Sequence, residues 1–303
     1  MSGNANSIKS ILYALTANFF IALAKTVAAV VTGSGSMFAE AIHSFADCTN
    51  QALLLLGLKR AKRPPSSEFP LGYGKEIYFW SFIVALILFS IGGLVSLYEG
   101  FHKLNHPQAL EVPYVALGVL IFAILAEGGS LWGCIVEINK VRGQQSLWRW
   151  FRNSRQSELI VIFGEDIAAL LGLIVATLAI ILTIITNNPV YDALGTLTIG
   201  FLLILISFLI GQQVKDLLVG QGVEPEVKVS MESFLQQRPE IDRLFNLVTL
   251  QMGNDVMVAV KAKMTTPIDT AELLANINRC EAAFSQAFPQ VMWLFFEPDI
   301  SDE

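Results

Sequence analysis

The chain begins with long apolar stretches and ends with a segment in which apolar and polar residues alternate. Six of the apolar stretches reach the roughly 20 residues that a membrane-spanning helix needs. We predict spans at Ile11–Thr32, Met37–Leu58, Ile77–Tyr98, Pro113–Ile138, Ser157–Ile185 and Tyr191–Gln212. The pattern therefore predicts a polytopic α-helical membrane protein with six transmembrane helices in residues 1–213.

After the sixth predicted span the pattern becomes that of a small soluble domain, which we place at residues 214–303. The predicted elements are a helix at Val223–Arg238, strands at Leu244–Met252 and Val256–Met264, a helix at Thr270–Ala287 and a strand at Val291–Phe296. Asp269 and Glu272 have the spacing of a capping box at the start of the second helix. The order αββαβ predicts a small α+β, ferredoxin-like domain with its helices on one face of a short sheet.

The composition agrees with a membrane protein. Of 303 residues, 53% are hydrophobic and 15% are charged, and the mean hydropathy is +0.56, which is too apolar for a soluble protein of this size. The formal net charge of -6 gives no support for nucleic-acid binding. The three cysteines are widely spaced, so the sequence predicts neither a disulfide framework nor a CxxC metal site.

Basic residues are concentrated on one side of the predicted membrane. The loops after the second and fourth spans hold Lys59, Arg60, Lys62, Arg63, Lys75, Lys140, Arg142, Arg149, Arg152 and Arg155. The loops on the opposite side hold only Lys103. By the positive-inside rule, we expect both termini and the α+β domain in the cytoplasm.

Two ionisable residues in the second span indicate a site within the membrane. His43 and Asp47 are four residues apart, so on a helix their side chains lie on one face and can bind one ion. The alternative is a polar pair that only hydrogen-bonds a neighbouring helix. Asp166 in the fifth span supports the ion site, because it and Asp47 both lie about 15 Å deep at 1.5 Å of rise per residue.

Four further ionisable residues within the predicted spans bear on this site. Glu165 adjoins Asp166, but neighbouring helical side chains point about 100° apart, so we rank Glu165 below Asp166 as a ligand. Glu127, at mid-depth in the fourth span, suits proton relay or support of the site. Lys25 is expected to be structural, paired with an acid such as Glu40, with a direct role in transport as the alternative.

Several stretches resemble the cation diffusion facilitator family, and the likeness covers nearly the whole chain. They are the His-x-x-x-Asp of the second span, Gly33-Ser34-Gly35-Ser36-Met37 before it, Phe69-Pro70-Leu71-Gly72-Tyr73-Gly74-Lys75-Glu76 after it, the acid in the fifth span and Asp192 at the sixth. The resemblance implies a homodimeric exporter that exchanges zinc or a similar divalent ion for protons. It also implies a four-ligand site in which His43, Asp47 and Asp166 take three positions.

The sequence departs from the family pattern at two places. Ile162 stands where many zinc-transporting members have a histidine, so the resemblance leaves the fourth ligand open. Gly72-Tyr73-Gly74 replaces a Gly-His-Gly, so the secondary site formed by those histidines is expected to be missing. The Glu165-Asp166 pair and the missing histidine resemble the branch of human zinc transporter nine and its bacterial relatives.

We therefore expect a secondary active transporter, a metal/proton antiporter, with zinc as the favoured cargo and no prosthetic group. Manganese, iron and cobalt suit similar ligands, and an intramembrane metalloenzyme or a channel or scaffold are rival classes. No HExxH motif is present, which argues against the enzyme. The α+β domain lacks histidine, so we expect a dimerisation module. The expected location is the bacterial inner membrane.

Overall fold

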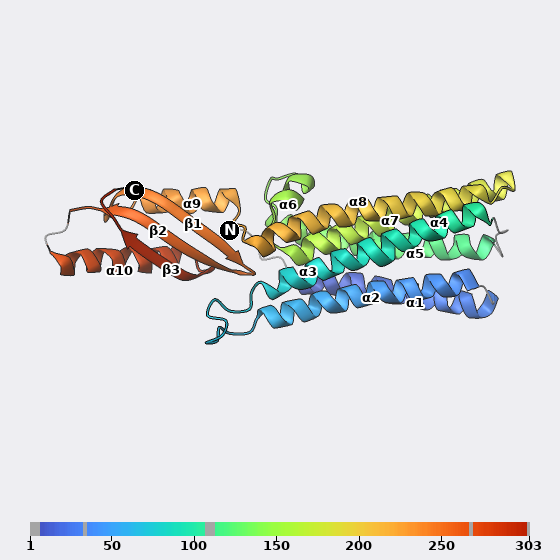
Figure 1. Cartoon of the computed structure of the whole chain (residues 1–303), viewed down its shortest axis with the longest axis horizontal. Coiled ribbons are helices and arrows are strands. Elements are labelled where there is room, and N and C mark those ends of the chain that lie inside the picture. The colour runs from blue at the N-terminus through green and yellow to red at the C-terminus, as the bar shows by residue number, and fades with distance from the viewer. Residues whose placement is uncertain (1–6, 33–34, 107–112, 267–268, 302–303) are drawn as a thin grey trace.

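The computed structural model describes residues 7–32, 35–106, 113–266 and 269–301, without the side chains of residues 28–29, 31–32, 35–43, 46 and 113. Long helices run side by side, and the α+β domain lies beyond one end of this bundle (Figure 1). The bundle helices are α1 (Ser7–Thr32), α2 (Gly35–Ala61), α3 (Glu76–Ile87), α4 (Val95–Asn105), α5 (Pro113–Val141), α7 (Ser157–Thr186) and α8 (Val190–Val219).

Five helical segments in the described part of the chain are long and apolar enough to cross a membrane. They are Ser7–Val27, Glu76–Asn105, Tyr114–Val141, Ser157–Thr186 and Val190–Val219. These segments correspond to five of the six predicted spans. The remaining predicted span is the second, Met37–Leu58, which falls on α2; it is not among these five segments and stays a prediction.

The third predicted span is one continuous helical segment with a π-helical turn in the middle. Leu88–Leu94, labelled η1, joins α3 to α4 and contains Gly92 and Gly93. A Cβ atom on Gly93 would lie only 2.5 Å from Cγ1 of Ile204 on α8, so a glycine is needed for this close packing. The sequence did not predict this turn, because it coincides with a contact between distant parts of the chain.

The structure differs from the predicted helices in two further ways at the end of the bundle near the α+β domain. A short helix, α6 (Leu147–Asn153), follows α5, and the Ser146 side chain caps it by accepting the Arg149 N–H at 3.3 Å. The α8 helix continues beyond the predicted Gln212 to Val219, because Val214 and Leu217 are still buried against the bundle.

The α+β domain has the predicted order. It consists of α9 (Pro225–Gln236), β1 (Ile241–Met252), β2 (Asp255–Met264), α10 (Thr270–Ala287) and β3 (Val291–Pro298). The sheet order is β1-β2-β3, with β1 antiparallel and β3 parallel to β2. Asp269 caps α10 as predicted, with its Oδ1 accepting the Glu272 N–H at 2.8 Å.

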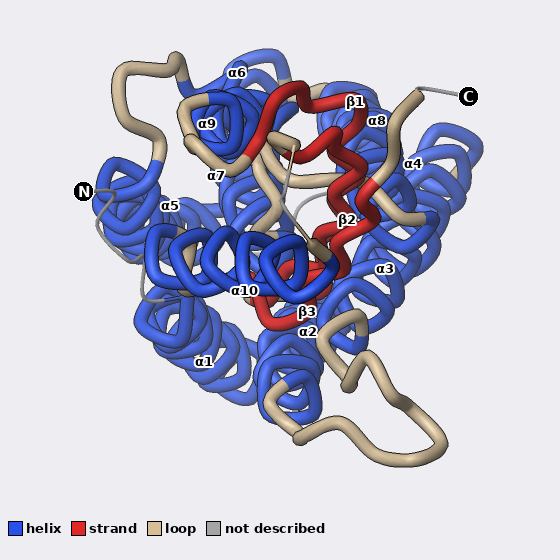
Figure 2. The backbone as a smooth tube through the Cα atoms, turned by 90° about the vertical axis from the view of Figure 1, so that its left-hand side faces the viewer, coloured by secondary structure: helices blue, strands red, loops and turns tan. Residues whose placement is uncertain are grey.

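The turn between β1 and β2 contacts the bundle. Gly253, in the left-handed region with φ 72°, donates its N–H to the Tyr78 hydroxyl at 3.0 Å. A Cβ atom on Gly74 would lie 1.9 Å from the carbonyl oxygen of Met252, so the backbones meet directly. Arg155, just before α7, donates from Nε to the Gly222 carbonyl at 2.6 Å. Figure 2, which views the molecule from this end, shows the sheet lying over the bundle helices.

Close packing of α4 on α8 gives a testable expectation. A Cβ atom on Gly200 would lie 2.8 Å from the backbone nitrogen of Leu97, whereas one on Gly118 of α5 meets nothing within 4 Å. Gly200→Ala should therefore lower the free energy of unfolding by about 1–3 kcal/mol. Gly118→Ala should leave it unchanged or raise it by about 0.5–1 kcal/mol. Thermal unfolding in detergent measures both, and equal melting temperatures would contradict the packing.

Candidate functional site

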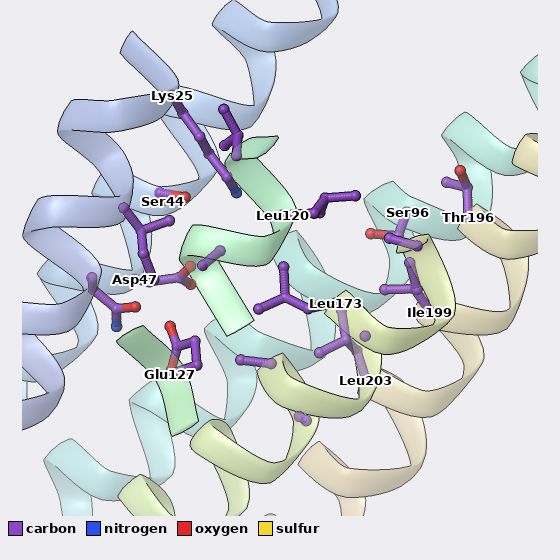
Figure 3. Close-up of a pocket in the computed structure, with 18 of the residues that line it drawn as sticks. Lys25, Ser44, Asp47, Ser96, Leu120, Glu127, Leu173, Thr196, Ile199 and Leu203 are labelled. Carbon is purple, nitrogen blue, oxygen red and sulfur yellow. The ribbon is translucent and has the colours of Figure 1, made fainter. Parts of the chain in front are cut away.

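A cavity of about 370 Å³ lies inside the bundle. Its walls come from α1, α2, α5 and α7 together with the η1–α4 segment and α8 (Figure 3). The middle of the cavity is apolar, with Leu120, Leu173, Ile199 and Leu203 among the lining residues. Polar side chains line the two ends.

One end carries four carboxyl groups from three helices, and we call this end the acidic site. Asp47 comes from α2, Glu127 from α5, and Glu165 and Asp166 from α7. Glu127, Glu165 and Asp166 are buried, with 5%, 6% and 2% of their surface exposed. Figure 3 shows the side chains of Asp47 and Glu127 pointing toward one another. The structure thus brings Asp47 and Asp166 to one cavity, the arrangement that their depths in the sequence predict.

Lys25 reaches the same cavity from α1. It is 7% exposed, and its side chain extends toward Asp47 in Figure 3. Its expected pairing with Glu40 stays a prediction, because the Glu40 side chain lies outside the described residues. The His43 side chain also lies outside them. Among the described side chains, no three of histidine, cysteine, aspartate or glutamate are grouped closely enough to hold a metal ion.

Two amide side chains of α2 hold Glu165. Nδ2 of Asn50 donates to Oε1 of Glu165 at 2.8 Å, and Nε2 of Gln51 donates to Oε2 at 2.9 Å. Asn18 on α1 donates in turn to Oε1 of Gln51 at 3.3 Å. Every group in this chain is buried. The amides therefore fix the carboxylate in place, and each of its oxygens keeps further acceptor capacity.

Asp166 is held from another helix. The hydroxyl of Ser130 on α5 donates to Oδ2 of Asp166 at 3.0 Å, and both residues are 2% exposed. Separate donors from α2 and α5 thus orient the adjacent acids of α7. Because ionised carboxyl groups are costly to bury unless positive charge or protons accompany them, the acidic site favours cations.

Sequence reasoning missed Asn50 and Gln51, because it based the site on ionisable side chains within the spans. Asn50 lies three residues after Asp47 and seven after His43, on the same helix face. That spacing was the available signal. No comparable spacing indicates a role for Ser130, because its contact with Asp166 depends on how α5 packs against α7.

The fold and the acidic site define a helical multi-pass membrane protein whose interior is suited to cations. The family model for the cation efflux transmembrane domain matches residues 11–219. The chain therefore belongs to the cation efflux family, as the cation diffusion facilitator resemblance predicted.

Known relatives support the same assignment. The mitochondrial proton-coupled zinc antiporter SLC30A9 of Xenopus laevis is 35% identical over 78% of this chain and 42% of its own length. The human SLC30A9 protein is 33% identical over 81% of this chain and 44% of its own length, in line with the predicted branch. The zinc transporter ZitB of Pectobacterium atrosepticum is 22% identical over 91% of this chain and 81% of its own length. The chain spans less than half the length of the SLC30A9 proteins.

The amide contacts to Glu165 lead to a stability expectation. Asn50→Ala leaves a buried carboxylate short of a donor, which should lower the free energy of unfolding by about 1–3 kcal/mol. The loss of unfolding free energy caused by Asn50→Ala should be smaller in a Glu165→Leu protein, in which the carboxylate has already been removed. Thr49→Ala is the matched control, because Thr49 is exposed and its hydroxyl donates to the Phe45 carbonyl on its own helix. If thermal unfolding shows that Asn50→Ala destabilises the wild type and the Glu165→Leu protein equally, the Asn50–Glu165 contact does not have this role.

Proposed function

We propose that the chain exports a divalent metal ion from the cytoplasm in exchange for protons, with zinc as the favoured cargo. The observation that carries the proposal is the convergence of Asp47, Glu127, Glu165 and Asp166 on one cavity deep in the bundle. Membership of the cation efflux family supports it. The names of SLC30A9 and ZitB, a zinc antiporter and a zinc transporter, favour zinc.

The proposed ligands are His43, Asp47 and Asp166, with Glu165 as the candidate for the fourth position. One imidazole with carboxylates forms a mixed nitrogen and oxygen set that zinc accepts in tetrahedral geometry. Manganese, iron and cobalt remain the alternative cargoes, because oxygen-rich sets suit them as well. The amides of Asn50 and Gln51 orient Glu165 toward α2, the helix that carries His43 and Asp47, which supports its inclusion.

Proton exchange follows from the chemistry of these ligands. An imidazole and carboxyl groups bind a metal ion only when deprotonated, so metal binding releases protons and protonation releases the metal. Rocking of helices around a fixed site would expose the acidic site to each side in turn. The rival function, an intramembrane metalloenzyme, has less support because the family model that matches the chain is that of cation efflux proteins.

We also propose the arrangement in the membrane. The α+β domain lies at the end of the bundle to which the basic loops belong, which supports a cytoplasmic position for this domain and both termini. The domain is proposed to join two copies of the chain, and α2 is proposed to cross the membrane as the second of six spans. A bacterial inner membrane agrees with the likeness to ZitB, whereas the SLC30A9 relatives are mitochondrial.

The ligand assignment is tested by zinc flux into reconstituted vesicles. Asp47→Ala and Asp166→Ala should each reduce flux to the level of empty vesicles, because loss of a charged ligand leaves the cation undercompensated in low dielectric. Asp216→Ala is the control, since Asp216 is half-exposed on α8 and does not line the cavity. Normal flux in either ligand variant would place the site elsewhere. A panel of zinc, manganese, iron and cobalt would identify the cargo.

Proton coupling has its own readout. With a pH-sensitive dye inside the vesicles, zinc entry through the wild-type protein should move protons outward and raise the internal pH. The Asp47→Ala protein should show neither zinc entry nor a rise in internal pH, whereas the Asp216→Ala protein should show both. Zinc entry that leaves the internal pH unchanged under a clamped membrane potential would rule out antiport and leave a uniporter or channel.

A further inference from the structure

The cavity continues from the acidic site to the end of the bundle far from the α+β domain, and its lining there is polar again. Glu99 and Lys103 come from α4, and Asp192 and Thr196 come from the start of α8. We call this part of the cavity the outer mouth. Figure 3 shows Thr196 and Ser96 on the side of the cavity opposite Lys25 and Asp47.

Lys103 stands among oxygen atoms from both helices of the outer mouth. Its Nζ lies 3.1 Å from Oδ2 of Asp192 and 3.6 Å from Oε1 of Glu99. It also donates to Oγ1 of Thr196 at 3.4 Å. Lys103 and Asp192 are only partly exposed, at 33% and 22% of the side-chain surface. One ammonium group therefore faces two carboxylates and a hydroxyl across the junction of α4 and α8.

Two carboxylates and a hydroxyl are also the oxygen donors that divalent cations bind. If the outer mouth held Glu99 and Asp192 without Lys103, its negative potential would concentrate and retain cations. Such retention would oppose release of the cargo, because an ion must be bound weakly enough to leave. The Lys103 ammonium occupies this position as a cation that cannot diffuse away.

We propose that Lys103 acts as a tethered cation that keeps the outer mouth from trapping the released metal ion. This role rests on the proposed function, since it concerns the exit of the cargo. It also explains why a lysine stands near the end of α4, on the side of the predicted membrane where the segments between spans hold no other lysine or arginine. The rival account is an ion pair that only joins α4 to α8.

Zinc binding to the purified full-length protein in detergent tests the proposal without transport. Lys103→Gln should bind one zinc ion more than the wild type in equilibrium dialysis. The additional site should disappear in Lys103→Gln with Asp192→Asn, and Lys103→Arg should bind as the wild type does. Lys215→Gln is the matched control, because Lys215 pairs with Asp216 at the other end of α8, outside the cavity. Unchanged zinc stoichiometry in folded Lys103→Gln would overturn the proposal.

Vesicle flux provides the second measurement. Zinc added on the side of the outer mouth should inhibit transport by Lys103→Gln at concentrations roughly tenfold lower than for the wild type. The addition of Asp192→Asn should restore wild-type sensitivity. If Lys103→Gln and Asp192→Asn alone slow transport equally, and the slowing does not depend on zinc at the outer mouth, the contact only joins α4 to α8 and the proposal is overturned. Absence of wild-type flux for zinc, manganese, iron and cobalt alike would refute the proposed function, and the dialysis result would still decide whether Lys103 blocks a cation site.

Discussion

The structure depends on the burial of acidic side chains in a medium that solvates charge poorly. Glu165 and Asp166 adjoin one another on α7, yet each is held by donors from a different helix. The helices α2, α5 and α7 are thereby tied to the same pair of residues. A scaffold built in this way cannot shift one helix without changing the surroundings of a carboxylate, which is the coupling that ion transport by helix movement requires.

Packing in the rest of the bundle is governed by close backbone approach. Gly93, Gly100 and Gly200 lie where the third span meets α8, and a Cβ atom on any of them would clash with the neighbouring helix. Between membrane helices, where water exclusion provides little attraction, such contacts supply much of the association energy. The same contact region holds one wall of the cavity, so its tight packing also positions Lys103 against Asp192.

Hydropathy and spacing predicted most of the fold. Five spans lie where they were predicted, although those ending at Asn105 and Val219 run seven residues beyond their predicted ends. All five elements of the α+β domain lie within a few residues of their predicted bounds, and Asp269 caps α10 as its spacing indicates. The π-helical turn at Leu88–Leu94 escaped prediction because it coincides with a tertiary contact at Gly93 rather than a local preference.

The site was predictable to the extent that it consists of charges placed at unusual depth. Asp47, Glu127 and Asp166 could be found from the cost of burying them. Asn50 and Gln51 are neutral, so hydropathy gives them little weight although they orient Glu165. The pairing of Lys103 with Glu99 follows from their spacing of one helical turn. Its pairing with Asp192 could not be predicted, because Asp192 lies on a helix that only the fold brings near.

The contact of the β1–β2 turn with the bundle has a thermodynamic consequence. Tyr78 on α3 binds Gly253, and Arg155 before α7 binds the carbonyl of Gly222, so the α+β domain is attached to the nearby ends of two separate helices. If those ends move relative to one another, the domain must rotate or lose one attachment. Any molecule that prefers one orientation of the domain then shifts the conformational equilibrium of the bundle, and by reciprocity a ligand in the bundle changes affinity at the domain by the same factor.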